Sequence, residues 1–180
     1  TLELPKRFFV IATQSPIELE GTFPLPEAQL DRFLMKIHIG YPKKEEELSL
    51  LERFIGQDPL LSLNAVSSPQ RILLLQQERK NVLVSPPVRE YITDLVGATR
   101  KHPKVRYGAS PRGSLGLTRA AQALALVRGR NFALPDDVKE LAGSVLPHRM
   151  ILRNEERAKG LTAEAVVAEI LATLPMPSPV

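Results

Sequence analysis

Residues 110–127 read SPRGSLGLTRAAQALALV, and this stretch carries a long helical pattern built largely from small side chains. Ser110 is a preferred N-cap residue and Pro111 suits the first helical position, so we expect the helix to begin there. The apolar positions recur at the three- and four-residue spacing of one helix face, at Leu117, Ala120, Ala121, Leu124 and Ala125. The stretch therefore predicts a long helix over 110–127.

Further helical patterns lie on both sides of this stretch. Amphipathic spacing and favourable first-turn residues predict other helices, at 43–55, 70–80, 87–100, 135–145 and 162–174. Residues 57–69 are predicted to be irregular, and residues 102–109 to form a basic loop. From residue 41 onward the chain is therefore predicted to be mainly α, without a convincing internal repeat.

The first forty residues have a different pattern. The run RFFVIAT at 7–13 is short, apolar and rich in β-forming residues, as in a strand buried on both faces of a parallel sheet. Residues 34–39 are a second strand candidate, and residues 26–33 a short helix between the two. Two strands joined by a long loop do not make a stable sheet alone. We therefore expect residues 1–40 to be the end of a larger α/β core, residues 41–85 a linker with a helical insert, and residues 86–180 an all-α domain.

Composition excludes several classes of function. The chain has 180 residues and no cysteine, which excludes disulfide scaffolds, thiol catalysis and cysteine-ligated zinc. Its three histidines are scattered, and no apolar stretch reaches the roughly 20 residues of a membrane helix. The N-terminus has no signal-peptide pattern. We therefore expect no metal site, no membrane partner and a cytoplasmic location.

The residues that follow the first strand candidate are one possible site. Gln14 and Ser15 come directly after the apolar run. Ligands of open α/β sheets bind beyond the carboxyl ends of strands, where such polar side chains can orient water or a phosphate. The alternative is a strand that simply ends in turn-forming residues.

Two arginines are the other candidates. Arg32 lies at the end of the short helix, where it either complements the helix dipole or presents its planar guanidinium to a phosphate. Arg112 falls in the first turn of the helix at 110–127, where a cation opposes the dipole. An anion at that helix end would remove the conflict. The alternatives are that Arg112 extends into solvent or pairs with a nearby acid.

Several segments that contain these candidates closely resemble the MoxR family of AAA+ ATPases. The matching segments follow the family's order over nearly the whole chain, at 9–18, 20–33, 91–100, 108–112, 129–138 and 145–149. The segment EGTFPLPEAQLDRF at 20–33 is the most specific of them. The resemblance implies the C-terminal end of a P-loop α/β core, with the sensor 1 strand and arginine-finger segment, followed by a helical AAA+ lid domain that carries sensor 2.

The resemblance also implies roles for individual residues. Gln14 and Ser15 correspond to the tip of the sensor 1 strand, which positions the attacking water, although the family usually has Asn in place of Ser15. Arg32 corresponds to the arginine finger, which acts on the nucleotide of the neighbouring subunit. Arg112 corresponds to the sensor 2 arginine, acting on its own subunit's nucleotide or on a neighbour's. Gly113 stands where the family commonly has Ala.

Two ATPase elements are missing from the sequence. No glycine is followed by lysine, as a P-loop requires, and no aspartate is followed by glutamate, as in the usual magnesium-binding strand. We therefore expect ATP and Mg to be bound mainly by residues absent from this chain, which alone should not hydrolyse ATP. The expected partners are the rest of the ATPase core, neighbouring subunits in a homo-oligomeric ring and a client protein.

Two readings from other classes remain open. One is a non-catalytic helical interaction module. The other is a nucleic-acid-binding helical domain, suggested by the isoelectric point of about 9.5. The basic residues are spread along the chain and aromatic residues are only 5 % of it, which disfavours nucleic acid as a partner.

Overall fold

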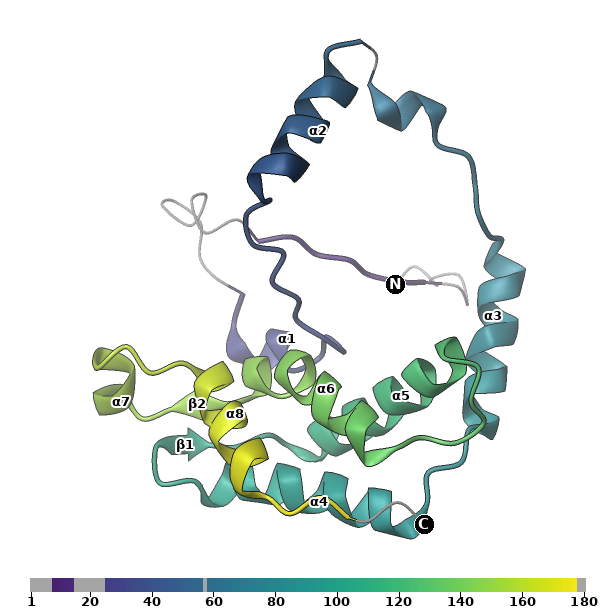
Figure 1. Cartoon of the computed structure of the whole chain (residues 1–180). Helices are drawn as coiled ribbons and strands as arrows, with labels where there is room; N and C mark the ends of the chain where they lie inside the picture. The colour runs from purple at the N-terminus through teal and green to yellow at the C-terminus, as the bar shows by residue number, and fades with distance from the viewer. Residues whose placement is uncertain (1–7, 15–24, 57, 178–180) are drawn as a thin grey trace, which may run out of the picture.

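The computed structural model describes residues 8–14, 25–56 and 58–177. This part of the chain is mainly helical, as the sequence predicts (Figure 1). In chain order its elements are α1 (Glu27–Leu30), α2 (Lys44–Phe54), η1 (Pro59–Ser62), α3 (Pro69–Glu78), η2 (Arg79–Asn81), α4 (Pro86–Lys101), β1 (Val105–Tyr107), α5 (Pro111–Val127), α6 (Pro135–Val145), η3 (Pro147–Arg149), β2 (Ile151–Leu152), α7 (Asn154–Ala158) and α8 (Ala163–Thr173).

A single apolar core lies among α4, α5, α6 and α8. Helix α5 packs against α6 and α4, while α8 packs against α4 and α6. Leu95, Leu117, Val138 and Val166 from these four helices are fully buried. The apolar faces predicted from periodicity in α4, α5 and α8 are therefore the faces that pack, whereas those of α2 and α3 contain no buried residue. We call residues 82–177 the helical body.

The helix boundaries follow local capping chemistry. The Ser110 hydroxyl accepts from the Arg112 N–H and opens α5, and the Thr162 hydroxyl accepts from the Ala165 N–H and opens α8. Helix α6 begins with Pro135 and two aspartates, as the sequence predicts. These starts were predictable because each depends on residues within one turn of the helix end.

A small antiparallel ladder joins β1 to β2, with Val105 opposite Leu152 and Tyr107 opposite Ile151. The sequence analysis predicted residues 102–109 to be only a loop, and it also missed the five-residue helix α7. Strands of three and two residues are too short to show an alternating pattern, so only the tertiary pairing reveals them.

Both longer strand predictions are wrong for the described residues. Residues 8–14 and 34–39 are extended but belong to no strand, and Phe9, Ile11 and Ile39 are 78 %, 80 % and 95 % exposed. A strand needs a neighbouring backbone for its N–H and C=O groups. Within the described ranges, residues 34–39 have one such contact outside their own segment, from the Lys36 N–H to the Ser144 carbonyl at 2.9 Å.

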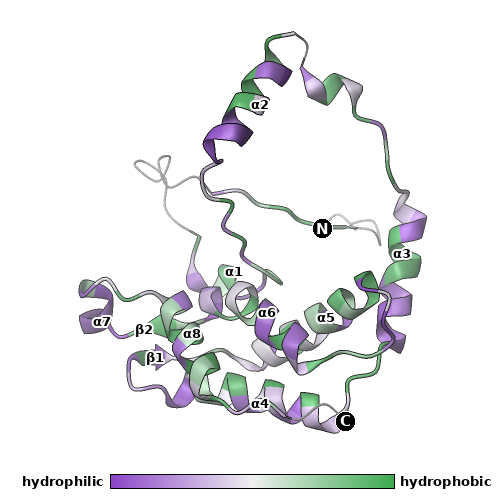
Figure 2. Cartoon of the chain, in the orientation of Figure 1, coloured by the Kyte–Doolittle hydropathy of each residue, from purple (hydrophilic) through white to green (hydrophobic). Residues whose placement is uncertain are grey.

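Helices α2 and α3 lie on an arch that leaves the helical body and returns to it through η2 (Figure 1). Their apolar side chains remain exposed, apart from the half-buried Leu73, and Figure 2 shows green apolar positions along both helices. The returning end is anchored where the Arg79 guanidinium donates to the Gln122 side chain at 2.8 Å and the Gln122 amide donates to the Val82 carbonyl at 2.9 Å. None of the described helices combines the length and the apolar character needed to cross a bilayer.

Helix α5 offers a matched test of the core. Leu117 is fully buried, whereas Leu115, two residues earlier on the same helix, is 55 % exposed. We expect Leu117→Ala to lower the free energy of unfolding by about 2–5 kcal/mol and Leu115→Ala by less than about 0.5 kcal/mol. Chemical denaturation monitored by circular dichroism measures both, and equal losses would contradict the assigned core.

Candidate functional site

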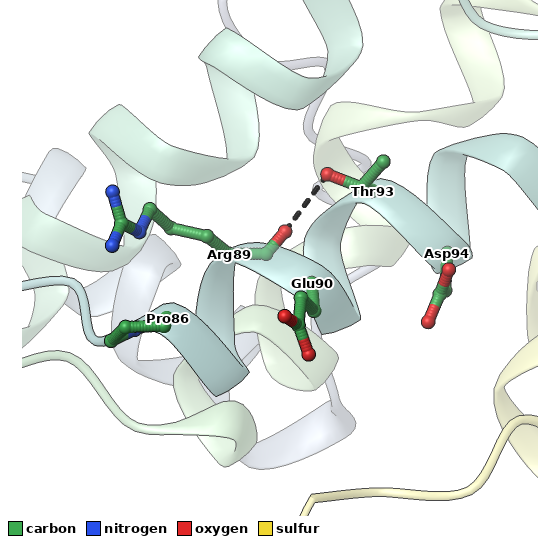
Figure 3. Close-up of a pocket in the computed structure, with 5 residues that line it drawn as sticks. All are labelled: Pro86, Arg89, Glu90, Thr93 and Asp94. Atoms are coloured by element: carbon green, nitrogen blue, oxygen red, sulfur yellow. Dashed lines mark hydrogen bonds between the residues drawn. The ribbon is translucent and has the colours of Figure 1, made fainter.

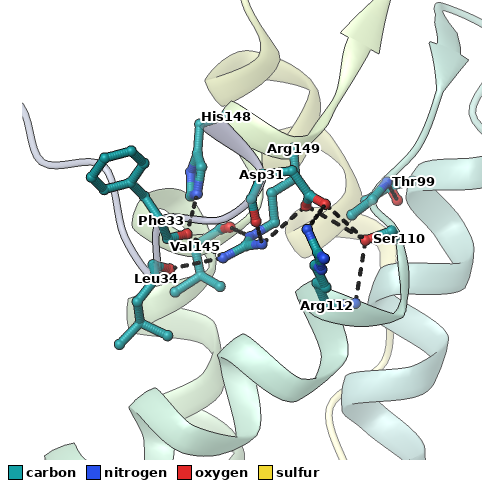
Figure 4. Close-up of polar contacts among 10 residues, drawn as sticks. Asp31, Phe33, Leu34, Thr99, Ser110, Arg112, Val145, His148 and Arg149 are labelled. Atoms are coloured by element: carbon teal, nitrogen blue, oxygen red, sulfur yellow. Dashed lines mark hydrogen bonds and ion pairs between the residues drawn. The ribbon is translucent and has the colours of Figure 1, made fainter. Parts of the chain in front are cut away.

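The candidate site lies where the segment after α1 meets η3 and the start of α5 (Figure 4). The Asp31 carboxylate is at its centre. It accepts from the Arg149 Nη1 at 3.0 Å, from the Arg112 Nη1 at 3.4 Å and from the Ser110 hydroxyl at 3.5 Å. One carboxylate therefore holds together three residues that are far away in the sequence.

A carboxylate, that of Asp31, lies at the N-terminus of α5. The sequence analysis left open whether Arg112 faces a bound anion or pairs with a nearby acid, and here it pairs with Asp31. The pairing is loose, because 3.4 Å is long for a charge-assisted hydrogen bond and the Arg112 side chain is 56 % exposed. Exposed pairs of this kind contribute about 0–1 kcal/mol, so Arg112 can leave Asp31 at little cost.

Arg149 makes the tighter contact with Asp31. Only 3 % of its side chain is exposed. Its Nε donates to the Val145 carbonyl at 2.8 Å, and its Nη1 donates to the carbonyl of Asp31 as well as to the carboxylate. Its Nη2 donates to the carbonyls of Phe33 and Leu34. A buried guanidinium thus ties η3 to the backbone that follows α1.

His148 caps the same segment. Its Nε2 lies 3.1 Å from the Phe33 carbonyl, which can only accept, so Nε2 carries the proton. Burial lowers the pKa of His148 below its ordinary value, and the charges of Arg149 and Lys36 lower this pKa further. Its Nδ1 is buried without a hydrogen-bond partner among the described residues, which suits a neutral ring.

The loop before α5 is fixed to the end of α4. The Thr99 hydroxyl accepts from the Ala109 N–H at 3.0 Å and donates to the Val96 carbonyl at 2.7 Å, while the Arg100 Nε donates to the Ala109 carbonyl at 2.8 Å. A Cβ on Gly108 would lie 2.5 Å from the Arg100 backbone nitrogen, so this position requires glycine. These contacts set where α5 begins and therefore where Arg112 lies.

The predicted site residues are placed as follows. Arg32 is exposed, and among the described residues its side chain has no ion pair or hydrogen bond. Arg112 pairs with Asp31, the residue that precedes Arg32 in the sequence. Gln14 is exposed on the extended segment 8–14 and has no hydrogen bond to this cluster, while Ser15 lies outside the described residues.

Asp31 and Arg149 are site residues that sequence reasoning missed. Both lie in segments that resemble the MoxR family, and Arg149 stands out as a charged residue between the buried Leu146 and Leu152. That pattern signals a buried charge and so a buried partner. The partner is 118 positions away in the sequence, so the sequence alone could not supply it.

Two hollows mark the surface. One of about 320 Å³ lies beside the site and is lined by Glu27, Asp31, Tyr107, Ser110 and Met150, among others. The other, about 510 Å³, runs along the outer face of α4, and its five lining residues all belong to that helix (Figure 3). Because a single helix cannot enclose a ligand, we place no site there. Within the described ranges, no three His, Asp or Glu side chains gather as a metal site would require.

Comparison with known proteins identifies both parts of this contact. Residues 97–170 match the AAA lid domain family, and residues 1–35 match the ATPase family associated with various cellular activities (AAA). The chaperone MoxR1 of Mycobacterium tuberculosis is 42 % identical over 186 residues, which cover 98 % of this chain and 49 % of MoxR1. The chain belongs to the MoxR family of AAA+ ATPases.

Other relatives agree with this family. The protein YeaC of Bacillus subtilis is 47 % identical over 177 residues, covering 98 % of this chain and 55 % of YeaC. A crystal structure of a candidate ATPase from Cytophaga hutchinsonii matches with a TM-score of 0.90 and 37 % identity, over 98 % of this chain and 56 % of that one. The chain thus spans about half the length of the curated relatives it matches.

The family matches show which parts of a MoxR-family chain are joined by the Asp31 cluster, which consists of Asp31 and the residues that bind its segment. Arg112, His148 and Arg149 lie in the segment that matches the lid, whereas Asp31 and Arg32 lie in the segment that matches AAA. The cluster is therefore a contact between an AAA segment and the lid.

His148 should make stability depend on pH. Because its pKa is lowered in the folded state, the unfolded chain takes up the proton more readily as pH falls below about 6.5, and the folded state loses stability. His148→Gln keeps an N–H donor near the Phe33 carbonyl but removes the titration. We expect its melting temperature to fall less than that of the wild type between pH 8 and pH 5.5, with each kcal/mol worth about 2–4 °C.

The control for this measurement is His38→Gln, since the His38 side chain is 67 % exposed. His38 pairs with Glu164 at 3.4 Å on the surface, and the weaker pH dependence expected of His148→Gln should be absent from this variant. Parallel melting curves for His148→Gln and the wild type across this pH range would contradict a buried neutral imidazole.

Proposed function

We propose that this chain supplies the arginine finger and the sensor 2 lid contact of an AAA+ ATPase that couples ATP binding and hydrolysis to remodelling or maturation of client proteins. The relative MoxR1 is named a chaperone, which supports this coupling. The observation that carries the proposal is the exposed guanidinium of Arg32, unpaired among the described residues, on a backbone that Arg149 holds on both sides.

The chemistry of phosphoryl transfer suits such a residue. Catalysis there is mainly positioning and charge stabilisation, and an arginine supplied across a subunit interface contributes about 10³–10⁵ in rate. The finger must be charged, uncommitted and rigidly placed. Arg32 meets these needs, because Asp31, the acid next to it in sequence, is bound by Arg149 and Arg112 instead.

The residues present suit a nucleotide phosphate. Arg149 and Arg112 both pair with the Asp31 carboxylate, and Arg32 follows Asp31 in the sequence, so these four side chains together carry a net positive charge. When bound, ATP supplies the phosphoanhydride bond that is cleaved, and Mg neutralises charge on its phosphates. Arg32 would stabilise developing charge, and Arg112 would bind phosphate oxygen. Residues outside this chain would hold most of the nucleotide and the metal.

The geometry favours one of the two alternatives for Arg112. Arg112 contacts Asp31, the residue adjacent to Arg32. A neighbour's phosphate reached by Arg32 would therefore also be near Arg112, so we assign both arginines to the nucleotide of the adjacent subunit. Gln14 and Ser15 remain the proposed sensor 1 pair, following the apolar run at 7–13. The proposed division is a core segment at 1–40, a linker and helical insert at 41–85 and a lid at 86–180, within a homo-oligomeric ring.

Replacing Arg32 tests the finger. In the full-length protein, Arg32→Ala should lower kcat for ATP hydrolysis by about 10³-fold or more, because the transition-state charge loses its partner. Nucleotide affinity, measured by fluorescence titration, should stay close to that of the wild type. The matched control is Arg157→Ala on α7, another exposed arginine, which should leave both quantities unchanged. An equal loss of affinity and turnover in Arg32→Ala would argue for a structural arginine.

Replacing Arg112 tests sensor 2. A hydrogen bond between charged groups contributes about 1.5–3 kcal/mol, so Arg112→Ala should weaken ATP binding roughly 10-fold or more in the assembled protein. It should also reduce the nucleotide-induced protection of the lid in hydrogen exchange. Arg112→Lys keeps the charge but not the planar guanidinium. Its ATP affinity and lid protection should lie between those of the wild type and those of Arg112→Ala. Unchanged affinity together with unchanged protection would remove Arg112 from the nucleotide site.

A further inference from the structure

All five N–H donors of the Arg149 guanidinium have acceptors. One is the carbonyl of Val145 in α6 at 2.8 Å, and the other four belong to the segment after α1. A buried charge is costly unless it is paired and fully hydrogen-bonded. Arg149 meets this condition only while the segment stays in place, so the segment and the arginine fix each other.

The four acceptors from that segment lie on both sides of Arg32. The carbonyl and carboxylate of Asp31 precede it, and the carbonyls of Phe33 and Leu34 follow it. Helix α1 has only four residues, so the carbonyls at its C-terminal end lack intrahelical hydrogen-bond donors. The buried guanidinium satisfies these carbonyls and thereby fixes the backbone from which the Arg32 side chain departs.

Helix α5 leaves room for this guanidinium. A Cβ on Gly116 would lie 3.5 Å from the Arg149 Nη2 and 3.2 Å from the Val145 Cγ1, and one on Gly113 would lie 3.8 Å from the Arg149 Cδ. Glycine inside a helix costs about 0.5–1 kcal/mol relative to alanine. The nearest atoms to these two built Cβ positions belong to Val145, Ala109 and Leu146, so the two glycines let α5 pack closely against Arg149 together with the apolar side chains around it.

We propose that Arg149 is a positioning residue for Arg32. It does not touch the nucleotide; it holds the backbone at 31–34 against the lid, so that the Arg32 guanidinium points in one direction toward the neighbouring subunit. This inference rests on the proposed role of Arg32 as the arginine finger. Because Arg149 belongs to η3, the position of the proposed finger would also depend on the lid.

The test is a double-mutant cycle in the full-length, assembled protein. Arg149→Lys keeps the charge but replaces a planar fork by a single ammonium, which cannot span acceptors on both sides of Arg32. A misplacement of about 1 Å can cost about 10²-fold in rate, so we expect Arg149→Lys to lower kcat by about 10- to 100-fold with little change in KM for ATP. In an Arg32→Ala background, Arg149→Lys should cause no further loss.

The matched control is Arg130→Lys. Arg130 pairs with the buried Asp137 at 2.6 Å in the loop between α5 and α6, and none of its hydrogen bonds reaches residues 31–34. Both lysine variants should lower the melting temperature, but only Arg149→Lys should lower kcat. Hydrogen exchange should likewise increase at residues 31–36 in Arg149→Lys alone.

The outcomes separate this inference from the proposed function. A loss of kcat in Arg32→Ala without one in Arg149→Lys would overturn the inference alone, as would losses that multiply in the double variant. Unchanged kcat in Arg32→Ala would overturn the proposed function and this inference with it. If Arg149→Lys does not fold, Asp31→Asn replaces it in the cycle, where a loss of kcat that disappears in the Arg32→Ala background supports the inference and an unchanged kcat overturns it.

Discussion

The contact between the buried Arg149 guanidinium and the segment after α1 is the constraint on which the site depends. A charge with almost no exposure to water must find an acceptor for every donor. The lid supplies one acceptor, the Val145 carbonyl, and the AAA segment supplies the rest. The short helix α1 has no buried residue of its own, so this polar contact holds it on the helical body, together with the His148–Phe33 and Lys36–Ser144 hydrogen bonds and the packing of Met35 against the core.

The Asp31 carboxylate binds two arginines, Arg149 and Arg112, with unequal strength. Its bond to the buried Arg149 is short, and breaking it would leave a buried charge without a partner, which is strongly unfavourable. Its bond to the exposed Arg112 is long and weak. A stronger anion, such as a phosphate, can therefore compete for Arg112 without disturbing Arg149. The start of α5 can change partners while the segment after α1 stays attached to the lid.

The sequence predicted those features that depend on neighbours within a turn or two. The starts of α5, α6 and α8 follow from Ser110, Pro135 and Thr162, and the buried faces follow from periodicity. The strand predictions at 7–13 and 34–39 were wrong for the described residues because a strand depends on a partner that local pattern does not supply. In the candidate site, too, local features were predictable from the sequence and distant partners were not. An acid near Arg112 was one of the expected alternatives, but its source lies 81 positions away.

The availability of Arg32 follows from the same network. An arginine beside an aspartate could be neutralised by it, and a finger neutralised in this way would gain little from a phosphate. Adjacent side chains at a helix end point in different directions, so Asp31 and Arg32 do not face each other by default. Arg149, Arg112 and Ser110 then engage the Asp31 carboxylate on the side of the lid. The lid thus engages the Asp31 carboxylate, and among the described residues this carboxylate makes no ion pair with the Arg32 guanidinium.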